Sequence, residues 1–213
     1  NAASFTAQQT LQTKFAEGLD KYREIFKKSS PHIDDIRSDL GRVLATALGQ
    51  NPKLLADAPI RAGWELAVSE LKKTLAKHPR ELNARLFLAQ FYVLFLQDPQ
   101  MARLAEQEFA EALKLSPKRQ QVLYHWSRVK LLQRDYDGAR QLLEQAVKDD
   151  PKIAITYWYL GILEAESGNF PAASKNIKQA LERGYVPQSE GEYLFAADIL
   201  KENKDYGLVK DFY

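Results

Sequence analysis

The residue types that most often carry catalysis or bind metals are few in this sequence and widely spaced. There is no cysteine, which removes thiolate nucleophiles, thiolate zinc sites and disulfides together. The three histidines, His32, His78 and His125, lie far apart, and none stands in a metal-binding spacing such as H-E-x-x-H. The acidic pairs Asp34-Asp35 and Asp149-Asp150 favour a helix start and a solvated helix end, and no phosphate loop or nucleophile elbow occurs. We therefore predict a protein that is not an enzyme, with no catalytic residue, metal or cofactor.

Charge and composition narrow the class further. The 30 basic and 28 acidic residues are interspersed and leave a formal charge of +2, so no field of one sign gathers phosphate backbones and we predict no nucleic-acid binding. Leucine, alanine, lysine and glutamate are frequent and glycine is rare, with 10 residues, which favours an all-α protein. The richest apolar stretch, residues 86–96, is too short to cross a bilayer core of about 30 Å. We predict that the 213-residue sequence does not insert directly into a membrane.

A pattern of small and large residues recurs with a period of 34 positions. Pro117 and Pro151 stand 34 apart, and the residues before them read A-x3-F-x2-A-x4-P and A-x3-L-x2-A-x4-P. A third copy begins with Y-x2-L-G at Tyr157 and continues with A-x3-I-x2-A from Ala173, although its closing proline is displaced to Pro187. A fixed period of this length indicates stacked supersecondary units.

This pattern resembles the tetratricopeptide-repeat (TPR) motif, in which a large apolar residue, a leucine-glycine pair, two small residues and a closing proline recur in a helix-turn-helix unit. The resemblance covers about residues 60–213. It includes a half unit that ends at Pro79, with Thr74 in place of a small residue, and a truncated unit that starts at Ala196. It implies a right-handed superhelical α-solenoid of about four TPR repeats over residues 59–213, with a concave inner face.

Residues 1–58 lack the repeat pattern. Phe15, Leu19, Tyr22 and Phe26 stand at helical spacing and predict a first helix over residues 5–28. A second helix is expected to open at Pro31, and residues 49–59 are expected to form a loop. We predict that the two helices form an N-terminal helical cap.

Small residues set how closely the paired helices approach. Gly161 is predicted to lie in a first helix where the second helix crosses it, and Ala139, Ala146, Ala173 and Ala180 are predicted to seat the second helices. Short turns are expected at residues 133–136 and 167–170, with Gly168-Asn169 suited to the left-handed residue that ends a helix.

In TPR proteins the first helices line the concave face, and positions near their start and middle meet the ligand. Carried over to this sequence, the partner-binding groove consists of Asn83, Phe87, Gln90, Gln121, Tyr124, His125, Arg128, Trp158, Tyr159, Ile162, Phe195 and Asp198. Its aromatic residues would hold apolar side chains, while Arg128 and Gln121 would pair with the backbone or a carboxylate of the bound segment. The alternative is that several of these aromatics fill the core between repeats. The lysine and asparagine set by which chaperone-binding TPR domains clamp a terminal carboxylate is absent, since Leu86 and Gln90 stand where it should begin.

Three hypotheses for function follow. The first is a bacterial-type adaptor that binds a peptide or protein segment in the concave groove. The second is a soluble appendage of a larger membrane or envelope assembly, such as polysaccharide polymerase, secretion or pilus machinery, and hydrophobic spans upstream in the full-length gene would support it. The third is a homodimer through the truncated last unit, residues 206–213, which light scattering across concentration would test.

The ends of the chain and its compartment lead to two further expectations. The opening Asn1-Ala2 resembles the remnant of a cleaved tag, and the chain stops inside an expected helix, so we expect a piece of a longer protein. The absence of cysteine fits a cytoplasmic or a periplasmic location, and the second hypothesis adds the soluble part of a membrane-anchored protein.

Overall fold

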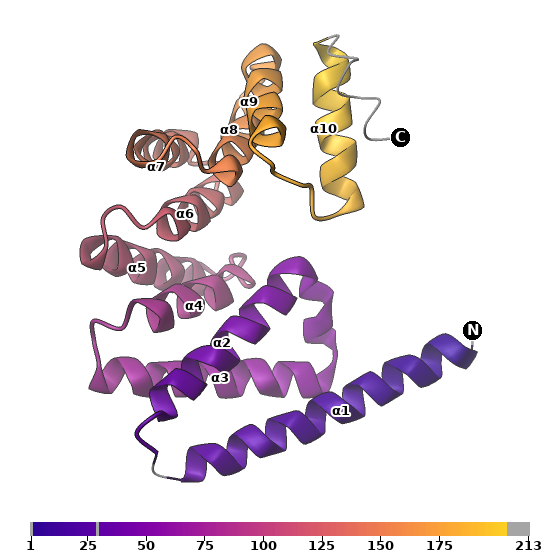
Figure 1. Cartoon of the computed structure of the whole chain (residues 1–213), viewed down its shortest axis with the longest axis vertical. Coiled ribbons are helices and arrows are strands. Elements are labelled where there is room, and N and C mark those ends of the chain that lie inside the picture. The colour runs from indigo at the N-terminus through magenta and orange to yellow at the C-terminus, as the bar shows by residue number, and fades with distance from the viewer. Residues whose placement is uncertain (1, 29, 204–213) are drawn as a thin grey trace. The chain divides into compact units, whose positions relative to one another are not determined.

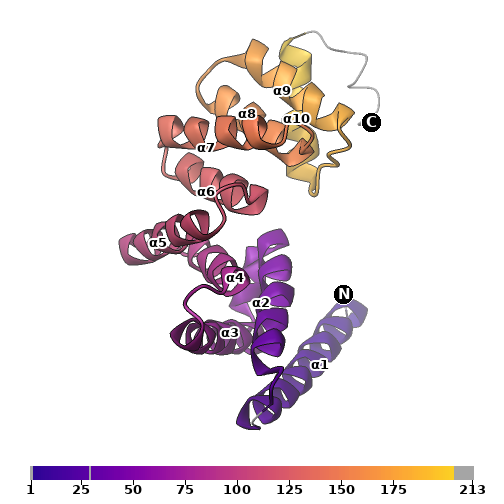
Figure 2. The same ribbon diagram turned by 60° about the vertical axis from the view of Figure 1, so that its left-hand side comes forward.

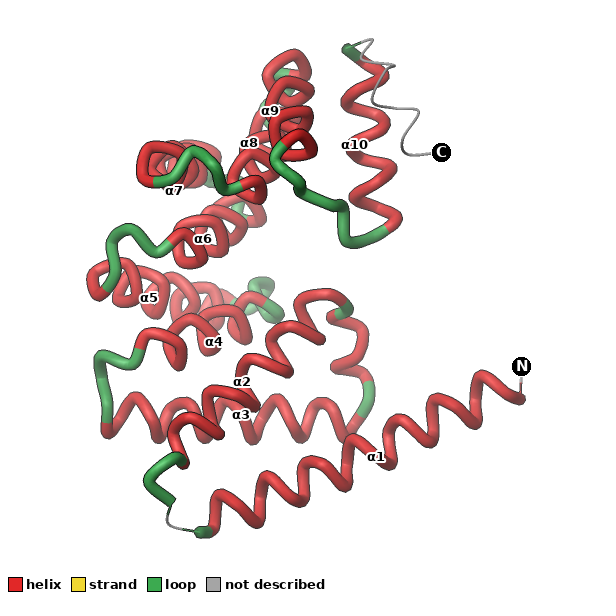
Figure 3. Tube along the Cα trace, viewed as in Figure 1, coloured by secondary structure: helices red, strands yellow, loops and turns green. Residues whose placement is uncertain are grey.

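The computed structural model describes residues 2–28 and 30–203, and every regular element in these ranges is a helix (Figures 1 and 3). Two compact units divide the chain, Asn1–Leu115 (unit 1) and Ser116–Tyr213 (unit 2). The elements of unit 1 are α1 Ala2–Lys27, α2 Ile33–Gln50, the 3-10 helix η1 Pro52–Ala56, α3 Ala58–Lys77, α4 Leu82–Val93 and α5 Pro99–Leu115. Those of unit 2 are α6 Gln120–Leu132, α7 Tyr136–Asp149, α8 Ala154–Glu166, α9 Phe170–Glu182 and α10 Glu190–Glu202. The predicted all-α class is confirmed.

Neighbouring helices pack in consecutive pairs within each unit. In unit 1 the pairs are α2 with α3 and α4 with α5, and in unit 2 they are α6 with α7 and α8 with α9. Figure 2 shows α8 beside α9 and α4 beside α5 from a second direction. Consecutive helix pairs are the units that the 34-residue period predicts.

Helix α2 has a role that its sequence did not indicate. It contacts both α3 and α4, and in unit 2 the first helices α6 and α8 contact each other in the same way. Helix α2 therefore takes the place of the first helix of the unit that ends at Pro79. The predicted loop over residues 49–59 is partly wrong, because α2 continues to Gln50 and η1 follows at Pro52–Ala56. The predicted boundary at residue 58 falls inside unit 1, and the division into a cap and a solenoid stays a prediction.

Helix α1 packs on α3 at a glycine. A Cβ atom on Gly63 would lie 3.0 Å from Leu19 Cδ2 and 3.2 Å from the ring of Phe15. Leu19 is buried, so part of the apolar stripe predicted for this helix faces α3. The absence of a side chain at Gly63 is what permits this close approach.

A polar network joins α2 to α3. Arg37 Nε lies 2.8 Å from Glu70 Oε2 and Arg37 Nη1 lies 2.8 Å from Asp34 Oδ1. The hydroxyl of Thr74 donates to Asp34 Oδ1 at 2.8 Å, and Lys73 Nζ lies 2.5 Å from Glu70 Oε1. Thr74 is fully buried. This hydrogen bond explains why a threonine stands where the repeat pattern has a small apolar residue, since a buried hydroxyl needs a partner.

Small residues occupy the helix crossings of unit 2, as predicted. A Cβ atom on Gly161 of α8 would lie 2.5 Å from Ile177 Cδ1 of α9, and no real Cβ contact is that short. The side chains of Ala139, Ala146, Ala173 and Ala180 are fully buried. Close packing at these points leaves no room for a larger side chain.

The two turns of unit 2 repeat the same geometry 34 residues apart. Gly168 has φ = 77° and Arg134 has φ = 60°, so each supplies the left-handed residue that ends a first helix. Asp135 accepts a hydrogen bond from Gly138 N at 3.0 Å, and Asn169 accepts one from Ala172 N at 3.4 Å. Each of these side chains caps the N-terminus of the second helix. The sequence identified the left-handed position at Gly168 but not at Arg134.

Candidate functional site

Most of the predicted aromatic groove residues of unit 2 lie in two groups of ring contacts, one between α6 and α8 and one between α8 and α10. The rings of Tyr124 on α6 and Tyr159 on α8 stack with centroids 6.2 Å apart. Trp158, also on α8, stacks on Tyr185 at 4.5 Å and meets Phe195 of α10 edge-on at 5.8 Å. We call the four half-buried rings, Tyr124, Tyr159, Tyr185 and Phe195, the aromatic surface. Such rings offer apolar contact area together with polar edges.

Trp158 belongs beneath this surface rather than on it. The side chain is 1% exposed and lies in the hydrophobic core of α8, α9 and α10. The prediction that Trp158 contacts a partner directly is therefore wrong for this structure, because its ring is covered by Tyr185 and Phe195. Its role is to support those two rings from below.

Arg128 and His125 share α6 with Tyr124. The imidazole of His125 lies 4.5 Å from the Tyr124 ring. Burial, together with the nearby Arg128 guanidinium, lowers the pKa of His125 to about 4. The positive charge of Arg128 also acts on Tyr159 and Tyr185, so these groups lie within its electrostatic reach. His125 is consequently neutral at pH 7.

The tyrosines of the surface are neutral as well. Burial, with a smaller contribution from Tyr159, raises the pKa of Tyr124 to about 12. Burial is also the main cause that raises the pKa of Tyr159 and of Tyr185. The hydroxyl of Tyr185 donates to Glu192 Oε2 at 2.9 Å. Each phenol can therefore donate a hydrogen bond near neutral pH.

The shift at His125 predicts a pH dependence of stability. Between pH 6.5 and pH 4 the unfolded chain binds a proton at His125 that the folded chain does not, so stability falls as the pH drops through this window. We expect His125→Gln to remove about 1–3 kcal/mol of this loss. Urea unfolding of both proteins at pH 7 and pH 4 measures the difference. Parallel changes in the two proteins would show that His125 does not contribute.

The other predicted site residues differ in exposure. Gln121 and Asp198 are exposed, and Ile162 and Arg128 are half-buried. In unit 1, on α4, Asn83 is exposed while Phe87 and Gln90 are half-buried. A groove that includes these unit 1 residues stays a prediction.

Two residues of this region were not predicted from the sequence. Tyr185 and Glu192 join the cluster through the hydrogen bond between them and through the stack on Trp158. A signal was present, because Gly184-Tyr185-Val186 displaces the expected closing proline to Pro187. Gly184 has φ = 86°, which turns the chain after α9 and brings Tyr185 onto α8.

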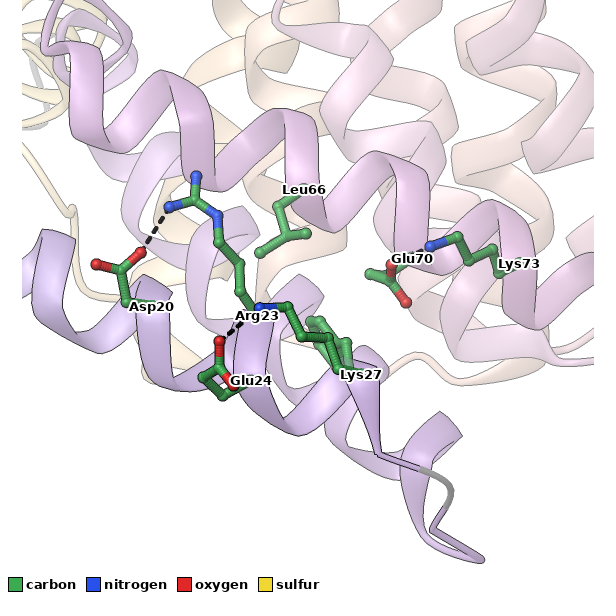
Figure 4. Close-up of a pocket in the computed structure, with 8 residues that line it drawn as sticks. Asp20, Arg23, Glu24, Lys27, Leu66, Glu70 and Lys73 are labelled. Carbon is green, nitrogen blue, oxygen red and sulfur yellow. Dashed lines mark hydrogen bonds and ion pairs between the residues drawn. The ribbon is translucent and has the colours of Figure 1, made fainter.

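A hollow lies between α1 and α3 in unit 1. It has a volume of about 570 Å³, and Phe26 and Leu66 are among the residues that line it. Figure 4 shows the charged side chains at its walls in pairs: Arg23 with Asp20 at 2.8 Å, Lys27 with Glu24 at 2.6 Å, and Lys73 with Glu70 at 2.5 Å. These three cations already have anionic partners, so they are less available to bind a ligand. We therefore take the aromatic surface as the candidate site.

Metal-binding clusters and membrane-spanning helices are both absent from the part of the chain that the structure describes. Its residues hold no cluster of three or more histidine, cysteine, aspartate or glutamate side chains placed to bind a metal ion. None of the helices within residues 2–28 and 30–203 combines the length and apolarity that crossing a bilayer requires.

Comparison with known proteins defines the class. A tetratricopeptide-repeat family model matches residues 124–184, whereas comparison with curated proteins finds no match. The chain therefore carries a tetratricopeptide repeat at these residues and has the fold of TPR proteins, which generally mediate protein–protein interactions and are generally not enzymes.

Several solved structures share this fold. TTC0263, a thermophilic TPR protein from Thermus thermophilus, has a TM-score of 0.65 and 18% identity, covering 92% of this chain and 96% of its own. PilF from Pseudomonas aeruginosa has a TM-score of 0.60 and 21% identity, covering 83% and 75%. MamA from Desulfovibrio magneticus RS-1 has a TM-score of 0.53 and 18% identity, covering 83% and 90%. At these identities the likeness concerns the fold alone.

Proposed function

We propose that this chain is an adaptor that holds a segment of a partner protein against the aromatic surface of unit 2. The observation that carries the proposal is a set of half-buried rings in two groups: Tyr124 stacks on Tyr159, and Tyr185 and Phe195 both contact the buried Trp158. Aromatic residues with a nearby arginine are the types most enriched at the energetic centres of protein interfaces.

Two features of the aromatic surface support binding rather than a purely structural role. Its four rings remain partly exposed, although the core beneath them is complete, with Trp158 and Ile177 almost fully buried. The rings are also held in place by packing and by the Tyr185–Glu192 hydrogen bond. Rings that are already ordered lose little conformational entropy when a partner binds.

The test is capture of partner proteins from the native lysate by the full chain. We expect Tyr159→Ala with Arg128→Ala to lose at least about 90% of the specifically captured protein, because hot-spot truncations each cost about 2 kcal/mol or more. Lys175→Ala with Glu182→Ala, at exposed positions of α9, is the matched control and should capture as wild type does. Quantitative mass spectrometry measures all three samples.

Equal capture by wild type and by the Tyr159/Arg128 variant would refute the proposal, provided that the circular dichroism spectra of the two proteins agree. Trp158 is unsuitable for this experiment because its replacement disturbs the core.

The full-length gene separates a free adaptor from an appendage of an envelope assembly, since only the appendage has membrane-spanning segments upstream. The dimer hypothesis depends on residues 206–213, which lie outside the described residues, and stays a prediction.

A further inference from the structure

We propose that Arg128 is the anion-binding residue of the aromatic surface, and that the partner segment presents an aspartate or glutamate side chain next to a large apolar side chain. This inference rests on the proposed function, because it names the chemistry of the segment that the surface would hold. It assigns a specific role to Arg128 and a class to the partner.

The first argument is that Arg128 has no carboxylate partner among residues 13–28, 30–49 and 51–203, whose side chains are described. Three other half-buried or buried arginines do have one: Arg37 pairs with Glu70 at 2.8 Å, Arg85 pairs with Glu108 at 2.6 Å, and Arg140 pairs with Glu164. A guanidinium that is partly withdrawn from water is costly unless an anion compensates it. Arg128 is half-buried, so an incoming carboxylate would supply the compensation that the chain itself does not.

The second argument concerns the groups around Arg128. The charge of Arg128 acts on His125, Tyr159 and Tyr185, and all three are neutral near pH 7. Glu192, whose negative charge also acts on Tyr159 and Tyr185, accepts hydrogen bonds from Tyr185 Oη at 2.9 Å and from Gln188 N at 2.7 Å. Within the described residues it forms no ion pair with Arg128. The guanidinium of Arg128 is therefore left to bind an anion from a partner, beside rings that suit apolar groups.

The third argument favours a side-chain carboxylate over a chain terminus. Terminal carboxylates are captured either by converging backbone N–H groups or, in chaperone-binding TPR domains, by a lysine and asparagine set that this sequence lacks. Arg128 lies well inside α6 Gln120–Leu132, where the backbone N–H groups are used in helical hydrogen bonds. A single arginine fork is instead suited to bind one carboxylate group with two parallel hydrogen bonds. The rings of Tyr159 and Tyr185 would then contact the apolar neighbour of the acidic residue.

The test uses three synthetic peptides titrated into the ¹⁵N-labelled full chain. The first has acetyl and amide ends and a central phenylalanine, glutamate, phenylalanine sequence. The second replaces the glutamate by glutamine, and the third is the glutamine peptide with a free terminal carboxylate. We expect the glutamate peptide to bind about tenfold more tightly than the glutamine peptide, since hydrogen bonds to charged groups contribute at this level. The shift of the Arg128 Nε–H resonance reports contact at the site.

Variants separate this inference from the proposed function. Arg128→Gln should reduce the tenfold preference to less than about twofold, while Lys175→Gln, which removes one positive charge at an exposed position of α9, should retain it. Equal binding of the first two peptides to wild type, absence of glutamate-peptide binding at millimolar concentration, or a preference for the free terminus would each overturn the inference. If Tyr159→Ala weakens all three peptides while Arg128→Gln changes none, the aromatic surface still binds a segment and only the role of Arg128 fails. If Tyr159→Ala leaves the binding of every peptide unchanged, the proposed function fails as well.

Discussion

Replacing Trp158 with alanine is expected to lower the free energy of unfolding by about 3–5 kcal/mol. The indole is 1% exposed and makes ring contacts with Tyr185 at 4.5 Å and Phe195 at 5.8 Å. Truncation removes this buried apolar area and leaves a cavity that the helices around it can only partly close. Urea unfolding followed by far-ultraviolet circular dichroism measures the effect.

Tyr159→Ala is the matched control, because Tyr159 is the aromatic residue next to Trp158 on α8 and is only half-buried. We expect it to lower the free energy of unfolding by less than half as much as Trp158→Ala, since folding buries less apolar area at this position. If the free energy of unfolding of Trp158→Ala lay within about 0.5 kcal/mol of the wild-type value, the assignment of Trp158 to the core would be wrong. The ring would then have to be counted among the partner-binding residues, as the sequence predicted.

The second large effect is expected at Glu70, whose side chain is 3% exposed where it meets Arg37. Glu70→Ala leaves the buried guanidinium with Asp34 as its remaining carboxylate, and we expect it to cost about 3 kcal/mol. The loss should appear in the unfolding of unit 1, because the network joins α2 to α3. Urea unfolding monitored through Trp64 fluorescence in a Trp126→Phe, Trp158→Phe background reports on this unit.

A double-mutant cycle of Arg37→Met and Glu70→Leu identifies the cause of that loss. The double variant should be more stable than Glu70→Leu alone, because no guanidinium then remains buried without Glu70. Lys73→Ala removes the outer partner of Glu70, and its side chain is 56% exposed, so we expect a cost below about 1 kcal/mol. If the double variant were as unstable as the single one, lost packing rather than an unpaired charge would explain the result.

The repeat pattern predicted the arrangement of paired helices well because its demands are local. A small residue was predicted at Gly161 because a second helix crosses a first helix there, and Ile177 of α9 does pack against Gly161 of α8. Gly168 had to end a helix, and its φ of 77° does so. These requirements depend on residues that are close in sequence or one helix away, so a single copy of the motif contains most of the information.

The candidate site was less predictable because adjacent residues on a helix point in directions about 100° apart. Trp158 and Tyr159 are neighbours of similar character, and the sequence assigned both to the groove. Only the packing of α9, Tyr185 and Phe195 shows that Trp158 is buried and Tyr159 is half-buried. The same holds for Tyr185, whose position depends on the turn at Gly184 rather than on any repeat position.

The order of residues was enough to predict that this chain forms helix pairs of the TPR kind, where small residues stand between those helices and where the turns occur. Those features follow from steric limits that recur in each repeat. Long-range packing decided that α2 serves as a first helix, that Arg37 and Glu70 form a buried pair, and that Arg128 stays without an acidic partner among the described residues. Each of these depends on side chains brought together from segments distant in sequence, and a pairing of that kind leaves no periodic signal in the chain.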